Sequence, residues 1–254
     1  MGIHWLEKEK FFPTAINKIE KADIVLDIGC GIMPQKYIRP RVHICCEPYD
    51  QYVKHLQEKM RTEYDRNYVI VHATWREVIK MFPPRSVDTV FLTDVVEHLE
   101  KEEAMKLLHD TEKIARKQIV VFTPLGFMPQ EHHDGKDAWG LDGAAWQEHK
   151  SGWHPEDFDD SWDVYATEKF HEEDNFGKKL ESPFGAFWAI KNMGYSEEDM
   201  NSALTKANLF TITDLAVELR LNILLKIVIG LMKILVKIKR SRFSVFLYRI
   251  FTER

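Results

Sequence analysis

The sequence predicts an α/β fold, built on a seven-stranded and mostly parallel sheet with helices on its flanks. Short apolar runs alternate with helix-like stretches across residues 22–188, the pattern of parallel strands joined by crossover helices. The runs are rich in Val and Ile, as expected of strands that are buried on both faces. A hydrophobic fraction of 44% over 254 residues supplies enough apolar side chains for a large core.

Five apolar runs give the first predicted strands, and helix-like stretches separate them. The strand candidates are residues 24–28, 42–46, 68–72, 87–92 and 118–122. The helices are expected over residues 50–64, 75–81 and 101–116, where the longer stretches carry apolar side chains at helical spacing. Two later runs, residues 162–166 and 184–190, complete the seven strands.

The remaining segments divide the chain into three parts. Residues 1–20 are expected to form a helical lead-in, residues 21–195 the main domain, and residues 196–254 a C-terminal helical segment. Residues 126–160 interrupt the strand pattern and hold four histidines and three tryptophans among many acids. A long stretch of this kind inside a compact domain is usually a lid or binding loop, so we expect a substrate-side lid.

The first predicted strand ends in the turn Asp27-Ile-Gly-Cys-Gly31, which indicates ligand binding. Its two glycines allow a tight turn in which bare backbone approaches a ligand closely. Asp27 is a carboxylate at the end of a buried strand, where it needs a cation or several donors. Glu47 ends the second strand twenty residues later, a spacing at which an acid can accept hydrogen bonds from both ribose hydroxyls. Together these residues predict a Rossmann-like fold that binds a cofactor with a ribose.

Three motifs resemble, in order and spacing, those of class I S-adenosylmethionine-dependent methyltransferases. They are Asp27-Ile-Gly-Cys-Gly31, Glu47-Pro-Tyr-Asp50 and Thr93-Asp-Val-Val-Glu-His-Leu99. The resemblance implies that the cofactor is S-adenosylmethionine, with the glycine turn beneath its methionine part, Asp27 near its amino group and Glu47 at its ribose. The cofactor contacts that the resemblance implies are Asp27, Gly29, Cys30, Gly31, Glu47, Pro48, Ala73, Thr74, Thr93 and Asp94.

The segment after the fourth strand supplies polar residues for catalysis. An alcohol acceptor requires removal of its proton by a histidine or a carboxylate, and the candidates are Asp94, His98 and the lid residue His149. Two other interpretations stay open from the sequence. Asp94 and Glu97 could instead charge the first turn of the following helix, and His98 could be a packed histidine.

The lid segment 147–158 resembles a His-x-Ser-Gly-Trp motif, followed by an acidic-Phe pair, of methyltransferases from bacterial surface-polysaccharide gene sets. Tryptophans with carboxylates and imidazoles are a suitable lining for a sugar. The alternative is that Trp153 and Phe158 attach the lid to the core.

The spacing of His132, His133, His149 and His154 matches no compact metal site, and we expect no metal.

The end of the chain differs in charge from the rest. Residues 221–254 carry eight Lys or Arg and one acid, a net charge of about +7, which leaves roughly −12 for residues 1–220. Lysines interrupt this apolar segment too often for a transmembrane span. It is typical either of an interfacial helix on anionic lipid or of a helix that packs on the main domain or on a second subunit, as in a homodimer.

Composition also excludes several classes of function. An acidic main domain is a poor binder of phosphate backbones, so no nucleic-acid partner is expected. Three cysteines form no disulfide framework, and the charged N-terminus is unlike a signal peptide. Both observations predict a cytoplasmic protein, which the basic end of the chain could dock on the inner face of the membrane.

The functional expectation is therefore a methyltransferase that methylates a hydroxyl of a sugar or lipid-linked glycan. There are two alternatives. The enzyme could methylate another small molecule or a lipid, or the chain could be a non-catalytic scaffold docked on a membrane. A nicotinamide-dependent oxidoreductase is disfavoured, because Ile32-Met33-Pro34 follows the turn where that fingerprint needs a third glycine.

Overall fold

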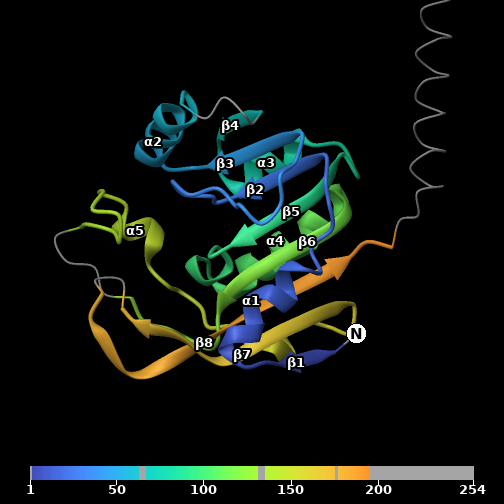
Figure 1. Ribbon diagram of the computed structural model, residues 1–254. Coiled ribbons are helices and arrows are strands. Elements are labelled where there is room, and N and C mark those ends of the chain that lie inside the picture. Colours follow the sequence, from blue (N-terminus) through green and yellow to red (C-terminus); the bar gives the residue numbers. More distant parts are fainter. Residues whose placement is uncertain (1, 63–66, 131–134, 175–176, 195–254) are drawn as a thin grey trace, which may run out of the picture. The chain divides into compact units, whose positions relative to one another are not determined.

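A computed structural model describes residues 2–62, 67–130, 135–174 and 177–194, which form an eight-stranded sheet with helices on both faces (Figure 1). The chain divides into two units, Met1–Gly194 and Tyr195–Arg254. The predicted C-terminal helical segment, with its basic stretch 221–254, lies outside the described residues. Within the part that is described, no helix is long and apolar enough to cross a membrane.

The sheet has the strand order β1-β7-β8-β6-β5-β2-β3-β4. Its strands are β1 (Ile3–Trp5), β2 (Ile24–Ile28), β3 (Val42–Glu47), β4 (Tyr68–His72), β5 (Val87–Thr93), β6 (Ala115–Pro124), β7 (Trp162–Glu173) and β8 (Lys179–Asn192). β8 runs antiparallel to both of its neighbours, and all other pairs are parallel. The predicted mostly parallel, Rossmann-like sheet is confirmed, with all seven expected strands present.

The eighth strand, β1, lies in the region that the sequence predicts as a helical lead-in. It pairs in parallel with the start of β7, where Ile3 lies opposite Val164. Its three residues are all exposed, so it has no buried face and leaves no apolar pattern in the sequence. The expected helix follows as α1 (Lys8–Ile16).

Helices cover both faces of the sheet, because successive residues of a buried strand point to opposite sides. On one face, Phe11 of α1 packs in a cluster with Val25 of β2. On the other face, Leu26 of β2 packs with Val78 of α3 (Trp75–Met81) and Leu107 of α4 (Lys101–Ile114). The strands are therefore buried on both faces, as their composition predicts.

The strand order reverses between β2 and β5, which are neighbours in the sheet although β3 and β4 lie between them in the chain. Ligands of open α/β sheets bind at such a point, outside the carboxyl ends of the strands. The segment after β2 holds the glycine turn, and the segment after β5 holds the predicted catalytic residues Asp94 and His98. Helix α2 (Asp50–Met60) follows β3 at the same edge and ends before the predicted residue 64.

Candidate functional site

The glycine turn after β2 has the backbone conformation that its sequence predicts. Gly29 and Gly31 have φ angles of +66° and +54°, in the left-handed region that favours glycine. A Cβ atom at Gly31 would lie 2.4 Å from Cη2 of Trp139, and one at Gly29 would lie 3.0 Å from a methyl group of Val95. Both positions therefore require glycine, for the backbone conformation and for the close neighbours.

Glu47 lies at the end of β3 and holds the glycine turn in place. Its Oε2 accepts a hydrogen bond from the Gly31 N–H at 2.9 Å, and its Oε1 accepts one from the Tyr49 N–H at 2.9 Å. Burial raises the pKa of this carboxyl to about 7, although the two backbone donors favour the charged form. Each carboxylate oxygen has a second lone pair, so Glu47 can still accept from a ligand hydroxyl.

Asp27 meets donors inside the protein, as a buried carboxylate must. Its Oδ2 accepts from the backbone N–H of Gln35 at 2.8 Å and lies 3.2 Å from Nε2 of His43. Burial lowers the pKa of His43, but the contact with Asp27 outweighs it and raises that pKa to about 9. The described contacts of Asp27 thus tie the turn to β3, and the predicted contact with a cofactor amino group stays a prediction.

The other predicted cofactor residues lie at the same edge of the sheet. Cys30 and Ala73 are buried, and the Ala73 N–H donates to the Glu47 carbonyl at 3.2 Å. The carbonyl of Pro48 accepts from His72 Nε2 at 3.0 Å. The hydroxyl of Thr74 donates to Glu77 Oε2 at 2.7 Å, so its side chain caps α3, and its predicted contact with the cofactor stays a prediction.

Thr93 is the last residue of β5, and Asp94 begins the turn that follows it. Asp94 has a φ angle of +52°, which is strained for a residue with a side chain, and its side chain is exposed. Strain of this kind is concentrated at functional sites. The hydroxyl of Thr93 is buried and makes no hydrogen bond to any described residue.

Glu97 lies in the short helix η1 (Val96–His98) and is 2% exposed. Thr123 donates its hydroxyl to Oε2 of Glu97 at 3.0 Å. Burial, and then the negative charge of Asp94, raise the pKa of Glu97 well above its ordinary value. Glu97 thus lies in the first turn of η1, as one interpretation expects, whereas the acids in the first turn of α4 are Glu102 and Glu103.

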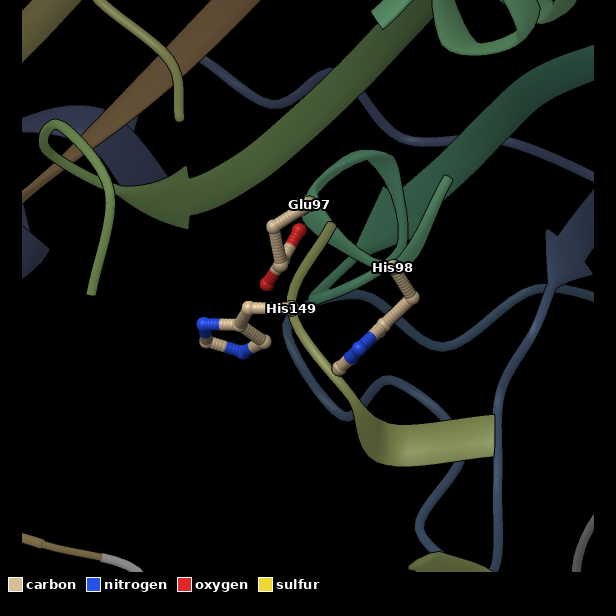
Figure 2. Close-up of side chains that lie close together, drawn as sticks. All are labelled: Glu97, His98 and His149. Atoms are coloured by element: carbon tan, nitrogen blue, oxygen red, sulfur yellow. The ribbon is translucent and has the colours of Figure 1, made fainter. Parts of the chain in front are cut away.

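The lid motif is bound to η1 through its backbone. The N–H groups of Lys150 and Ser151 donate to the Glu97 carbonyl at 2.7 and 3.1 Å. These bonds bring the ring of His149 next to that of His98, with 4.9 Å between their centroids (Figure 2). Two of the predicted catalytic residues, from distant parts of the sequence, are therefore neighbours.

Trp153 attaches this motif to the core. Its side chain is fully buried, its Nε1 donates to Ser151 Oγ at 2.9 Å, and Phe158 packs against it with 5.7 Å between ring centroids. The Lys101 ammonium lies 3.7 Å from the centre of the indole and donates to the Gly152 carbonyl at 2.8 Å. Of the two interpretations of Trp153 and Phe158, the structure supports attachment to the core.

A second part of the lid covers the glycine turn. Tyr52 of α2 donates to Asp137 Oδ2 at 2.5 Å, and Asp137 Oδ1 accepts from the Trp139 N–H at 2.9 Å. These contacts hold the Trp139 indole against Gly31. Sequence reasoning missed Tyr52 and Asp137, since neither belongs to a motif and only the folded lid brings them together. His132 and His133 lie outside the described residues.

Comparisons with known proteins find similarity in structure alone. No protein-family model matches the chain, and no curated protein matches its sequence. TehB from Haemophilus influenzae is 14% identical, with 72% of this chain and 62% of that chain covered and a TM-score of 0.49. An S-adenosylmethionine-dependent methyltransferase from Archaeoglobus fulgidus is 18% identical, with a TM-score of 0.42. That match covers 72% of this chain and 90% of that chain.

The cyclopropane synthase MmaA2 from Mycobacterium tuberculosis is 17% identical, with a TM-score of 0.37. That match covers 45% of this chain and 42% of that chain, so this chain spans less than half of the synthase. Identity and TM-scores at this level assign no activity to the chain, and the function must be inferred from the residues of its own site.

Proposed function

We propose that this chain is an S-adenosylmethionine-dependent methyltransferase. The observation that carries the proposal is Glu47, a buried acid at the end of β3 that is hydrogen-bonded to the N–H of Gly31. It places an acid that can accept from ribose hydroxyls beside a left-handed glycine turn, at the point where the strand order reverses.

The residues present fit this cofactor. Gly29 and Gly31 expose bare backbone, Glu47 supplies a ribose acceptor, and the exposed carboxylate of Asp94 lies at the end of the neighbouring strand. When bound, the cofactor would supply a methyl group on a positively charged sulfur. Trp139 packs on Gly31, so binding on that side of the turn requires the indole to shift.

The acceptor that we propose is a hydroxyl, on a sugar or a lipid-linked glycan. His98 and His149 lie together at the end of β5, where a base could take the hydroxyl proton. Nδ1 of His149 lies 2.6 Å from the Met128 carbonyl, and a carbonyl only accepts, so in the neutral ring the lone pair belongs to Nε2. Trp146 is 46% exposed and offers an aromatic face to a sugar ring.

Calorimetry of the full chain with S-adenosylmethionine, S-adenosylhomocysteine and NAD tests the cofactor. We expect the first two ligands to bind and NAD to bind more weakly or not at all, because the turn lacks the third glycine of the dinucleotide fingerprint. Tighter binding of NAD would overturn the assignment. Incubation of extracts with cofactor labelled on its methyl group, followed by mass spectrometry, would then identify the acceptor.

Glu47→Gln should weaken binding of S-adenosylmethionine by about 1.5–3 kcal/mol, since a charged acceptor is lost. The thermal midpoint of the ligand-free protein should fall as well, because Glu47 also holds the N–H groups of Gly31 and Tyr49. Calorimetry and thermal unfolding measure the two effects. Glu58→Gln is the matched control: it removes the charge from an exposed acid of α2 and should leave cofactor affinity unchanged. Unaltered affinity in Glu47→Gln would contradict the proposed role.

We also propose that the basic segment 221–254 docks the protein on anionic membranes. The charge pattern predicts that the full chain sediments with vesicles of phosphatidylglycerol and that salt releases it. Replacing Lys226, Lys233 and Lys237 with Glu should abolish sedimentation and leave cofactor binding intact. Vesicle binding that survives this charge reversal, or is absent from the unmodified chain, would favour packing on the main domain or on a second subunit.

A further inference from the structure

Glu97, His98 and His149 converge at the end of β5, outside the residues assigned to the cofactor. Each offers one ligand atom, and the three atoms lie within 4.8 Å of one another (Figure 2). Glu97 comes from η1 with His98, whereas His149 comes from the lid motif. The sequence gives no sign of this set, because the histidine spacing within the lid matches no compact site.

The carboxylate of Glu97 has one oxygen that the described protein leaves unsatisfied. Thr123 donates to Oε2 at 3.0 Å, but Oε1 is buried and accepts from no donor among the described residues; the other group that interacts with this carboxyl is Asp94, an acid itself. A buried oxygen without a donor is costly, and most such groups in native proteins have a partner. A bound cation would supply the missing partner.

Both histidines are arranged as metal ligands usually are. Nδ1 of His149 lies 2.6 Å from the Met128 carbonyl, and Nδ1 of His98 lies 3.2 Å from the Glu148 carbonyl. Because a carbonyl only accepts, each Nδ1 carries a proton, and in a neutral ring Nε2 holds the lone pair. A hydrogen bond from the second ring nitrogen to a carbonyl is what orients most metal-bound histidines.

The backbone around the cluster holds the two segments together. The Glu97 carbonyl accepts from the N–H groups of Lys150 and Ser151, and the Ser151 hydroxyl donates to the Val96 carbonyl at 3.2 Å. Trp153 then ties Ser151 to the core. His149 is thereby held beside Glu97 by contacts that do not involve its own ring.

We propose that Glu97, His98 and His149 form a binding site for a divalent transition-metal ion. Two imidazoles and one carboxylate suit Zn²⁺, Mn²⁺, Fe²⁺ or Co²⁺ better than Mg²⁺, which prefers oxygen ligands. Bonds of about 2.1 Å require tetrahedral ligand atoms roughly 3.4 Å apart, so small side-chain rotations close the cluster onto an ion. Three protein ligands leave coordination positions open, as in catalytic rather than structural sites.

An open position on this ion would take an oxygen of the methyl acceptor, and His98 and His149 would then act as ligands of the ion and not as the base. A hydroxyl that binds a divalent ion loses its proton more readily, which favours an acceptor with an alcohol group. This last use of the ion rests on the proposed methyltransferase function, whereas metal binding itself does not.

The test is metal binding by the full chain, freed of metal with a chelator. Titration calorimetry with ZnCl₂, MnCl₂ and MgCl₂, and visible absorption with CoCl₂, should show one ion per chain for the transition metals and much weaker binding of Mg²⁺. We expect Glu97→Gln and His149→Asn each to lower affinity at least tenfold, as loss of a ligand does. His154→Asn and Glu148→Gln, exposed neighbours in the same segment, are the matched controls and should bind as the unmodified chain does.

Circular dichroism confirms that each variant is folded before its affinity is compared. The proposal is overturned if the folded, unmodified chain binds no transition metal stoichiometrically. The buried carboxyl of Glu97 would then be neutralised by a proton instead of a metal ion. The proposal is equally overturned if Glu97→Gln and His149→Asn bind as tightly as the controls. Calorimetry with S-adenosylmethionine in the same preparation separates the two proposals. Metal binding without cofactor binding would contradict the methyltransferase function but support the metal site.

Discussion

Replacing Trp153 with alanine should lower the free energy of unfolding by about 3–5 kcal/mol. The indole is fully buried, lies under the Lys101 ammonium and packs against Phe158, so truncation leaves a large cavity. It also removes the donor to Ser151 Oγ. The Ser151 hydroxyl in turn donates to the Val96 carbonyl and so links the lid motif to η1. Chemical denaturation of the ligand-free protein measures the effect.

Two control variants show whether the loss of stability comes from the buried position of Trp153. Trp153→Phe keeps most of the ring and should cost less than Trp153→Ala. Trp146→Ala removes a tryptophan of the same lid that is 46% exposed and should change stability by no more than about 0.5 kcal/mol. If Trp153→Ala behaves like Trp146→Ala, the lid is not attached to the core through this residue. We also expect Trp153→Ala to weaken metal binding, since His149 loses its support.

The ligand-free protein should become less stable as the pH rises from about 5 to 9, because several buried groups have raised pKa values in the folded chain. Glu47 has a pKa of about 7 in the folded chain against an ordinary value of 4.5, because burial opposes its charge. Between these two values the folded state holds a proton that the unfolded state has released, so stability falls as pH increases. A shift of this size corresponds to on the order of 3 kcal/mol.

His43 extends the decline to higher pH. Burial lowers its pKa, but the contact with Asp27 prevails and raises it to about 9, from an ordinary 6.5. The stabilisation from this pair is fully present below pH 6.5 and is lost as the pH rises through 9. Glu97, whose pKa burial also raises, acts in the same direction as Glu47.

Denaturation curves at half-unit intervals of pH measure this dependence. Glu47→Gln should flatten the lower part of the curve, and His43→Gln should flatten the upper part while it keeps a side-chain donor for Asp27. Stability that rises between pH 5 and 9 in the unmodified chain would contradict both assignments.

The sequence by itself determined the central sheet and the glycine turn. Short Val- and Ile-rich runs mark β2 to β6, because a strand covered on both faces must be apolar along its length. The turn at Gly29 and Gly31 and the acid at Glu47 were also predictable, because their spacing relative to the strand ends is a local property of the chain. Burial of Asp27 required donors, and the structure provides them in Gln35 and His43.

Only the tertiary structure decided which distant residues meet. Strand β1 joins the sheet through backbone hydrogen bonds to β7, and such bonds need no apolar side chain that a sequence pattern could reveal. The interpretations of Trp153 as a sugar contact or a core residue were equally compatible with its position in the lid. His149 reaches Glu97 and His98 because two backbone N–H groups of the lid bind one carbonyl of η1. Contacts of this kind depend on how the lid folds back over the sheet, and no spacing within one segment encodes them.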